Sequence, residues 1–268
     1  MQTKVEGLLL SKRPFQENHL LCHLLLRNGR KIVTVFYGGR GGGKKNSPSL
    51  LELGYMMDLE LAKTKRNSDL YRAKEWMNSW IHHKVRESYR AYLHLCFFVE
   101  VIERIAPEED LWEAQENDAN EFEGIFRVLS NTLFYLEKYL ETKGKDFSAI
   151  MANFLCKLIN QQGFLPSIAT CCLSDEPFEA NDRILFMQDK GGFAKAAYVN
   201  DYVQEAPGSE LDGRIVLNVF KQITFEKTSE LDLTKPVSHP VLKSLFHYFC
   251  FQNQLQPDTF KTYKTIFK

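Results

Sequence analysis

Residues 4–37 read KVEGLLLSKRPFQENHLLCHLLLRNGRKIVTVFY, and this stretch decides the fold of the N-terminal part. Its apolar residues gather into three runs of strand length, each rich in leucine, isoleucine, valine or aromatic residues. The runs are residues 4–12, 17–27 and 30–37. They predict three consecutive β-strands.

The second run alternates in the way a strand with one buried face must. Its buried face is formed by Leu20, Cys22, Leu24 and Leu26. Asn28-Gly29 separates the second and third runs, and this pair tolerates the positive φ angles of a type I′ hairpin turn. The stretch therefore predicts an antiparallel hairpin with a fixed register.

A glycine-rich basic loop follows the third run. It reads GGRGGGKKNSPS at residues 38–49, and its five glycines and one proline disfavour regular structure. Strand character returns at 50–65, and NSDLY at 67–71 begins either a last strand or a helix. Short antiparallel strands within about 70 residues, joined by one mobile loop, fit a small closed barrel.

From about residue 72 the pattern becomes helical, because apolar residues recur at steps of three and four. Proline and glycine end the first three of these stripes. The predicted helices are 85–102, ending before Pro107; 122–140, ending at Gly144; 147–159, ending at Gly163; and two later ones at 209–225 and 239–254.

The composition suits a cytoplasmic protein with a substantial core. The chain has 268 residues, of which 44% are hydrophobic, and no run approaches the roughly 18–20 apolar residues that span a bilayer. The N-terminus lacks the long apolar run and small-residue cleavage site of a signal peptide. Four of the six cysteines lie in apolar runs and are expected to be reduced core residues: Cys22, Cys96, Cys156 and Cys250.

The net charge of zero conceals a strong asymmetry along the chain. Residues 1–75 hold 14 Lys and Arg against 7 Asp and Glu, whereas the remainder holds 20 against 27. A basic module joined to an acidic body is typical of proteins that bind a polyanion.

One motif could indicate an enzyme. Gly38–Lys44, GGRGGGK, has the spacing of a phosphate-binding loop after a strand. Such a loop also needs a Ser or Thr for magnesium and a helix beginning at the phosphates. Lys45 and Pro48 stand there instead, so we expect neither nucleotide hydrolysis nor any other enzymatic activity.

The same loop suits the backbone of a nucleic acid, because glycine permits close approach and the basic side chains neutralise phosphates. The predicted DNA contacts are Lys12, Arg13, Arg27, Arg30, Lys31, Arg40, Lys44 and Lys45. Four aromatic residues lie among them and could stack on bases, with only one or two expected outside the core: Phe15, Phe36, Tyr37 and Tyr55. No pattern for base-specific readout is present, so the expected target is single-stranded DNA of any sequence.

No metal or other cofactor is expected. Cys171-Cys172 is an adjacent pair with Ser174 where a C-x-x-C motif would place its second thiol, and no further cysteine or histidine follows until His239. A tetrahedral zinc site normally needs two spaced pairs of ligands. His82-His83 are expected to be solvated residues at a helix start rather than ligands.

Seven segments in order resemble the RecO family of bacterial recombination mediators. They are VEGLLLSKRPFQENHLLCHLLLRNGRKI, YGGRGGGKKNS, SDLYRAKEW, ESYRAYLHLCFFVEVIERIAPEED, EFEGIFRVLSNTL, FLCKLINQQGFLPSIATC and LFHYFCFQNQL. The resemblance runs nearly from end to end, and its specificity lies in the order and spacing of the segments.

The resemblance implies an α+β protein with an OB-fold barrel at 1–78 and a helical domain at 79–268. It also implies a zinc-finger-like element at about 164–200. Many family members carry two C-x-x-C pairs in this element, but only Cys171 stands at a matching position here. The element is therefore expected to be metal-free and held by packing.

The resemblance further implies a function at the nucleoid. RecO proteins bind single- and double-stranded DNA, anneal complementary strands and associate with RecR. They also bind the acidic C-terminal tail of the single-strand-binding protein SSB, and so help RecA to load. A groove for that tail needs basic residues on helices, and the candidates are Arg104, Arg127, Lys138 and Lys157.

Two other functions stay open at this point. The barrel could be an OB-type adaptor whose basic patch meets an acidic protein, or an RNA-binding module, since electrostatics do not distinguish the 2′-hydroxyl. A triple Arg40, Lys44 and Lys45 to Ala variant is predicted to bind DNA more weakly and with a flatter salt dependence.

Overall fold

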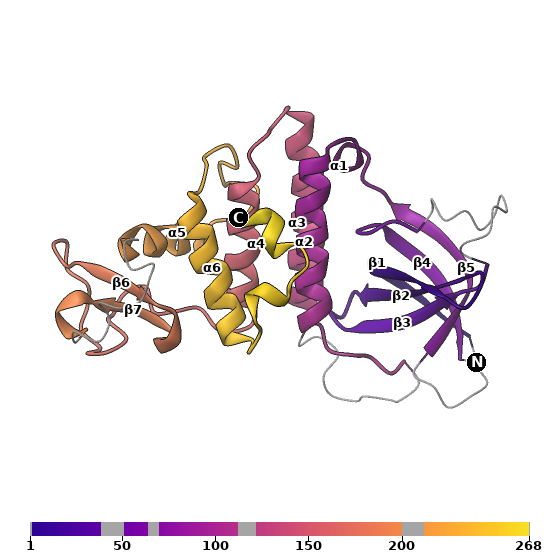
Figure 1. The fold of residues 1–268 in the computed structure, drawn as a ribbon, viewed down its shortest axis with the longest axis horizontal. Helices are drawn as coiled ribbons and strands as arrows, with labels where there is room; N and C mark the ends of the chain where they lie inside the picture. The colour runs from indigo at the N-terminus through magenta and orange to yellow at the C-terminus, as the bar shows by residue number, and fades with distance from the viewer. Residues whose placement is uncertain (1, 39–50, 64–69, 112–121, 200–211, 268) are drawn as a thin grey trace. The chain divides into compact units, whose positions relative to one another are not determined.

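The computed structural model describes residues 2–38, 51–63, 70–111, 122–199 and 212–267. The chain divides into two compact units, Met1–Lys143 and Gly144–Lys268 (Figure 1). Within these ranges, the first unit contains a β-barrel and three α-helices, and the second contains four α-helices, short 3-10 turns and a β-hairpin.

Five strands of the first unit form a closed barrel in the order β1-β2-β3-β5-β4. They are β1 (Gln2–Phe15), β2 (His19–Leu26), β3 (Lys31–Phe36), β4 (Met56–Lys63) and β5 (Leu70–Trp80). All neighbouring pairs are antiparallel except β3 and β5, which are parallel. A small five-stranded barrel of this kind is of the OB type, which confirms the predicted α+β fold class.

Strand β1 is long because it pairs with two neighbouring strands along different parts of its length. Its N-terminal half pairs with β4, and its C-terminal half pairs with β2. The register shifts between Leu9 and Ser11, which leaves Leu10 as an extra residue. Such a bulge bends a strand and increases its twist, and here it carries β1 from one side of the barrel to the other.

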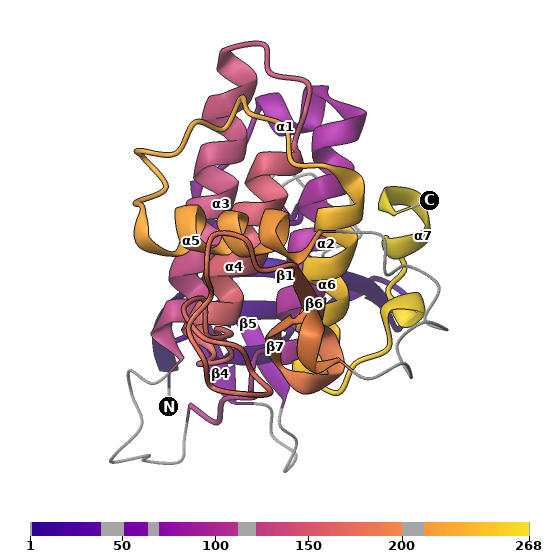
Figure 2. The ribbon, with the colours of Figure 1, turned by 90° about the vertical axis from the view of Figure 1, so that its left-hand side faces the viewer.

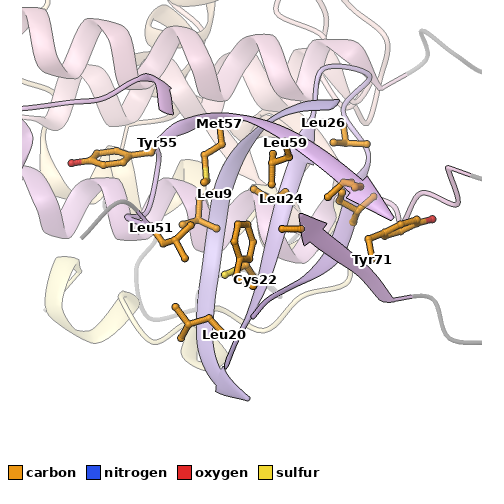
Figure 3. Packing of buried hydrophobic residues seen from close by; sticks show 14 residues of the cluster. Leu9, Leu20, Cys22, Leu24, Leu26, Leu51, Tyr55, Met57, Leu59 and Tyr71 are labelled. Atoms are coloured by element: carbon orange, nitrogen blue, oxygen red, sulfur yellow. The ribbon is translucent and has the colours of Figure 1, made fainter. Parts of the chain in front are cut away.

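The barrel interior is a continuous cluster of buried side chains (Figure 3). Leu24 on β2 and Leu59 on β4 come from opposite sides of the ring, and Leu9 of β1 lies between their strands. Each fully buried leucine stabilises the fold by about 1.5–3 kcal/mol relative to an exposed one. The predicted inward face of β2 is confirmed, since all four of its members belong to this cluster.

The hairpin between β2 and β3 differs from the predicted type I′ turn. Only Gly29 of the Asn28-Gly29 pair has a positive φ, of 80°. The Gly29 amide donates to the Leu26 carbonyl over 2.9 Å, and the Leu26 amide donates to the Arg30 carbonyl over 2.8 Å. This is a three-residue loop in which a type I turn is followed by a left-handed glycine.

The helical pattern read from about residue 72 begins too early, because β5 extends to Trp80. The β5 register shifts opposite Glu60 and Leu61 and leaves Lys74 as an extra residue. Tyr71 and Ala73 face the core before this bulge, and Trp76 packs against the core after it. The bulge breaks the alternation that would have indicated a strand.

Three helices complete the first unit: α1 (Lys84–Glu87), α2 (Tyr89–Ile105) and α3 (Glu123–Glu141). Ser88 caps α2 by accepting a hydrogen bond from the Ala91 amide, and Pro107 follows its last turn as expected. Helix α3 holds α1 in place, because the Glu137 carboxylate accepts hydrogen bonds from the backbone amides of 83–85.

His82 is buried and is not the solvated residue expected from the sequence. Its Nε2 donates to the Leu53 carbonyl over 2.7 Å, and its ring packs edge-on against Tyr55. Its Nδ1 has no hydrogen-bond partner among the described residues. Burial lowers the pKa of His82 because a charged imidazolium is disfavoured there.

The second unit is built on α4 (Ser148–Gln161), α5 (Gly213–Phe225) and α6 (His239–Gln252), and ends in α7 (Tyr263–Ile266). Helix α4 packs against both α5 and α6. The hairpin of β6 (Ile184–Met187) and β7 (Gly192–Lys195) lies against α5 (Figure 2). The later helices agree with the predicted ones to within a few residues.

Aromatic side chains hold this hairpin to the helices. The rings of Phe186 and Phe193 lie 4.8 Å apart, and Phe186 lies 5.2 Å from Tyr248 of α6. The Tyr248 hydroxyl donates to the carbonyl of Phe164 over 2.7 Å. The buried hydroxyl therefore has a partner, as a core tyrosine requires.

Candidate nucleic-acid interface

The outer face of β1, β2, β3 and β5 carries two rows of side chains. Directly paired residues of neighbouring strands lie on the same face, so the register defines each row. The first row runs Arg13, Leu21, Val35 and Arg72 across the four strands. Its two ends are exposed arginines, whereas Leu21 and Val35 between them are buried.

The second row is aromatic and begins with Phe15, which pairs with His19. The rings of His19 and Tyr37 lie 4.4 Å apart, and the Arg72 guanidinium lies 4.7 Å from the centre of the Tyr37 ring. The Gly38 amide donates to His19 Nδ1 over 3.2 Å, which fixes the ring. Tyr37 is 39% exposed, so part of its side chain is accessible to a ligand.

An open aromatic ring between cations can bind a strand of nucleic acid. The ring stacks on a base, and the guanidinium groups neutralise phosphates on either side. The stack stands immediately before the basic loop, of which residues 39–50 lie outside the described ranges. The predicted contacts Arg40, Lys44 and Lys45 fall in that loop, so the structure does not place them.

Three of the predicted DNA contacts share this outer face: Arg13, Phe15 and Tyr37. Arg13 is exposed, and it forms no ion pair with any described residue. Of the other aromatic candidates, Phe36 and Tyr55 are buried in the barrel. Their position follows from strand alternation rather than from ligand binding.

Two of the predicted DNA contacts near the hairpin turn, Arg27 and Arg30, bind other residues of the first unit. Arg27 forms an ion pair with Glu6 of β1, and its guanidinium lies 5.6 Å from the Phe126 ring. Arg30 lies over the Phe122 ring at 5.0 Å and is largely buried. Both arginines therefore tie the barrel to the start of α3.

The other two are also held by internal partners. Lys12 donates to the Leu51 carbonyl over 2.7 Å and pairs with Glu52 at 3.0 Å. Lys31 donates to the carbonyl of Glu103 in α2 over 2.7 Å. An ammonium group with such partners contributes less to phosphate binding than an exposed one.

Helix α2 covers the next part of this outer face. The Glu103 carboxylate accepts a hydrogen bond from Ser11 and is paired with His23, both at 2.5 Å. Burial opposes ionisation, but the bonds from His23 and Ser11 hold the pKa of Glu103 below its ordinary value. The negative charge of Glu103 disfavours a polyanion, so the surface available to a nucleic acid ends at this residue.

Arg72 and His19 were not among the residues predicted from the sequence to contact DNA. Arg72 lies where β5 was read as the beginning of the helical region, and its role depends on the parallel pairing of β3 with β5. His19 gives no signal beyond its position at the start of a strand. Tyr37 was found because it adjoins the basic loop.

The four basic residues proposed for a partner tail differ in environment. Arg104 and Arg127 pair with glutamates one turn earlier, at 3.5 and 2.8 Å. Lys138 is exposed on α3, whereas Lys157 donates to the carbonyls of Thr224 and Glu226. Burial lowers the pKa of Lys157, which makes it a structural residue rather than a free cation.

Helix α3 presents a stripe that includes two of these residues. Arg127, Phe134 and Lys138 lie on one face, since they are seven and four residues apart. Phe134 is 51% exposed. This arrangement combines an apolar anchor with two cations.

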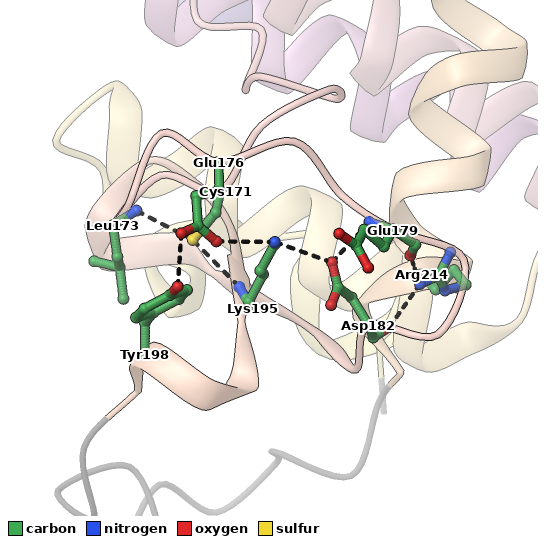
Figure 4. Close-up of polar contacts among 8 residues, drawn as sticks. All are labelled: Cys171, Leu173, Glu176, Glu179, Asp182, Lys195, Tyr198 and Arg214. Atoms are coloured by element: carbon green, nitrogen blue, oxygen red, sulfur yellow. Dashed lines mark hydrogen bonds and ion pairs between the residues drawn. The ribbon is translucent and has the colours of Figure 1, made fainter.

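The zinc-finger-like element keeps one thiol at its centre (Figure 4). The buried Cys171 Sγ accepts hydrogen bonds from the amides of Leu173 and Lys195 at 3.5 and 3.3 Å. Burial alone would raise the pKa of this thiol, but the hydrogen bonds from Ser174, Lys195 and Leu173 lower it overall.

A small ion-pair cluster lies in the same element as this thiol. Lys195 Nζ lies 3.0 Å from Glu176 and 3.4 Å from Asp182, and the Tyr198 hydroxyl donates to Glu176 over 2.8 Å (Figure 4). Across the described ranges, no three His, Cys, Asp or Glu side chains are arranged to hold a metal ion. The adjacent thiols of Cys171 and Cys172 therefore do not fit the four-ligand zinc site that the resemblance implies for other family members.

Comparison with known proteins points in one direction. The chain is 24% identical to the DNA repair protein RecO of Prosthecochloris aestuarii over 203 residues, which are 73% of this chain and 71% of that protein. It is 26% identical to the DNA repair protein RecO of Chlorobaculum parvum over 200 residues, 72% of this chain and 71% of the relative. No protein-family model matches the chain. In sequence the chain is thus RecO-like.

None of the described helices is long and apolar enough to cross a membrane.

Proposed function

We propose that this protein acts in DNA repair as a non-enzymatic protein that binds single-stranded DNA on the outer face of its barrel. The observation that carries the proposal is the Tyr37 ring, which contacts both His19 and Arg72 and is still partly exposed. The two RecO relatives support the DNA-repair role. Because the contacts are electrostatic and stacking interactions, binding would be independent of sequence.

The wider role follows from the family resemblance. In this proposal the protein also binds double-stranded DNA, anneals complementary strands, and works with RecR to help RecA load on SSB-coated DNA at the nucleoid. A surface that grips the sugar-phosphate backbone leaves base edges free to pair, which is what annealing needs. The SSB tail would bind the α3 stripe of Arg127, Phe134 and Lys138, where an acidic peptide finds two cations around an apolar anchor.

Fluorescence anisotropy with a labelled single-stranded oligonucleotide of mixed sequence, repeated at several salt concentrations, tests the DNA-binding surface. The Arg13→Ala/Arg72→Ala variant should bind more weakly. Each lost phosphate contact flattens the slope of log affinity against log salt by about 0.7 for a single strand, so the double variant should lose about 1.4.

The matched control is Lys4→Ala/Lys84→Ala, which removes two exposed cations of the first unit that lie outside both rows. This control should keep the slope of the unmodified protein. An unchanged slope in the Arg13/Arg72 variant would exclude this face as the DNA site. Parallel titrations with RNA of the same sequence and with an acidic peptide separate the two alternative functions.

A further inference from the structure

A second outer face of the barrel is acidic, and it lies on strands β1, β4 and β5. The register places Lys4, Glu60 and Glu75 in one row across these strands. The neighbouring row consists of Glu6, Asp58 and Met77. Four of the six outward side chains are therefore carboxylates, and one is basic.

These side chains line a hollow of about 560 Å³. Among these six outward side chains Met77 is the apolar one, and it is 65% exposed. The intervening residues Val5, Leu59 and Trp76 also border the hollow, but their side chains pack toward the barrel core. The hollow thus combines one exposed apolar side chain with an acidic rim.

The charges of the rim are only partly balanced within the described part of the chain. Glu6 is paired with Arg27, which also feels the charge of Asp58, and Lys4 stands opposite Glu60. None of the ion pairs there involves Asp58, Glu60 or Glu75 directly. Elsewhere on the same barrel, carboxylates such as Glu52 have a lysine or arginine partner.

One pair on the rim costs stability. Glu60 and Glu75 stand directly opposite each other on β4 and β5. Like charges in this position destabilise a sheet, because their side chains lie close together on the same face. Lys4 of β1 stands opposite Glu60 on its other side and offsets part of this repulsion, and a further cation bound at Glu75 would relieve the rest.

We propose that the hollow is a docking site for a lysine- or arginine-rich segment of a partner protein that carries an apolar anchor. The anchor would contact Met77, and the basic side chains would pair with Asp58, Glu60 and Glu75. The same negative charge repels a nucleic acid, so this face and the Tyr37 face select ligands of opposite charge.

The test uses the full chain labelled with ¹³C in the methionine methyl groups, with the Met77 signal assigned from a Met77→Leu sample. The probe is the peptide acetyl-KKFKK-amide, and acetyl-EEFEE-amide is its acidic counterpart. The basic peptide should shift the Met77 signal saturably, while the acidic peptide and a single-stranded oligonucleotide should not. The proposal would be overturned if the basic peptide did not shift the Met77 signal. It would also be overturned if the acidic peptide or the oligonucleotide shifted this signal equally.

A charge-removing variant separates binding from folding. Glu60→Gln/Glu75→Gln should weaken binding of the basic peptide by about twofold to thirtyfold, since two exposed ion pairs worth about 0.2–1 kcal/mol each are lost. Its melting temperature should stay equal or rise, because the like-charge repulsion is gone. The control Glu87→Gln/Glu141→Gln removes two exposed carboxylates from helices of the same unit and should bind the peptide as the unmodified protein does. Equal peptide affinity in the Glu60/Glu75 variant and the control would refute the site. DNA binding is measured separately, so failure here leaves the proposed function intact.

Discussion

Replacing Gly29 with alanine tests how the barrel is joined to α3. Gly29 has a φ of 80°, and a Cβ built there would lie 1.7 Å from the carbonyl oxygen of Phe122. The left-handed conformation costs a non-glycine residue about 1–2 kcal/mol. The clash adds to this, because the backbone of Phe122 must move by roughly 1.5 Å to restore an ordinary contact.

That movement would break two contacts at the start of α3. The guanidinium groups of Arg30 and Arg27 lie over the rings of Phe122 and Phe126, and each such contact contributes about 0.5–1 kcal/mol. The Gly29→Ala variant should therefore lose about 2–4 kcal/mol of the free energy of unfolding of the first unit. Urea denaturation followed by tryptophan fluorescence measures this, because all three tryptophans of the chain lie in that unit.

Gly163 provides a matched control. Its φ is 76°, but a Cβ there would meet nothing within 4 Å. Gly163→Ala should cost only the backbone part, about 1–2 kcal/mol in the second unit, as measured by far-UV circular dichroism. If Gly29→Ala costs no more than Gly163→Ala, the close approach of the hairpin to Phe122 does not constrain the fold, and the reasoning above is wrong.

Three further predictions concern other parts of the molecule. Tyr37→Ala should weaken single-strand binding by about 1–3 kcal/mol with little change in salt slope, while Tyr37→Phe should retain affinity; a flattened slope would point to lost phosphate contacts instead. Burial lowers the pKa of His82, so as the pH falls the imidazole is protonated in the unfolded chain before it is protonated in the folded one. The free energy of unfolding should therefore decrease below about pH 6.5, by at most about 1.4 kcal/mol per pH unit. The pH dependence of unfolding should flatten in His82→Gln, and an unchanged dependence would show that another group is responsible. Chelator treatment should leave the melting temperature of the second unit unchanged, whereas Lys195→Met should lower that temperature. A melting temperature that falls with the chelator would show that a metal is bound.

Much of the fold could be predicted from local signals. Pro107, Gly144 and Gly163 follow the ends of α2, α3 and α4 within three residues. The inward face of β2 could be predicted because its four core residues recur at every second position, although Leu21 and Leu25 of the other face are buried as well. These features depend on residues near one another in the chain, which is why they can be read from it.

The parts that the sequence did not reveal depend on distant residues. The C-terminal half of β5 looked helical because the extra residue Lys74 shifts its alternation. The internal partners of Arg27 and Lys31 lie 21 and 72 residues away, so their basic side chains looked free. Arg72 reaches Tyr37 only through a parallel strand pair that no local pattern announces.

The closed ring of strands also limits how any partner can be recognised. Each of the five strands is hydrogen-bonded to another strand on both sides along part of its length, so none has a whole side unpaired. Short stretches remain paired on one side only, since β3 meets β5 just at residues 70–73. An extended peptide therefore has little edge to join as an additional strand, a common mode for open sheets. Side chains on the outer faces are then the main means of holding a ligand, and single substitutions there can abolish the binding of one ligand and spare that of another.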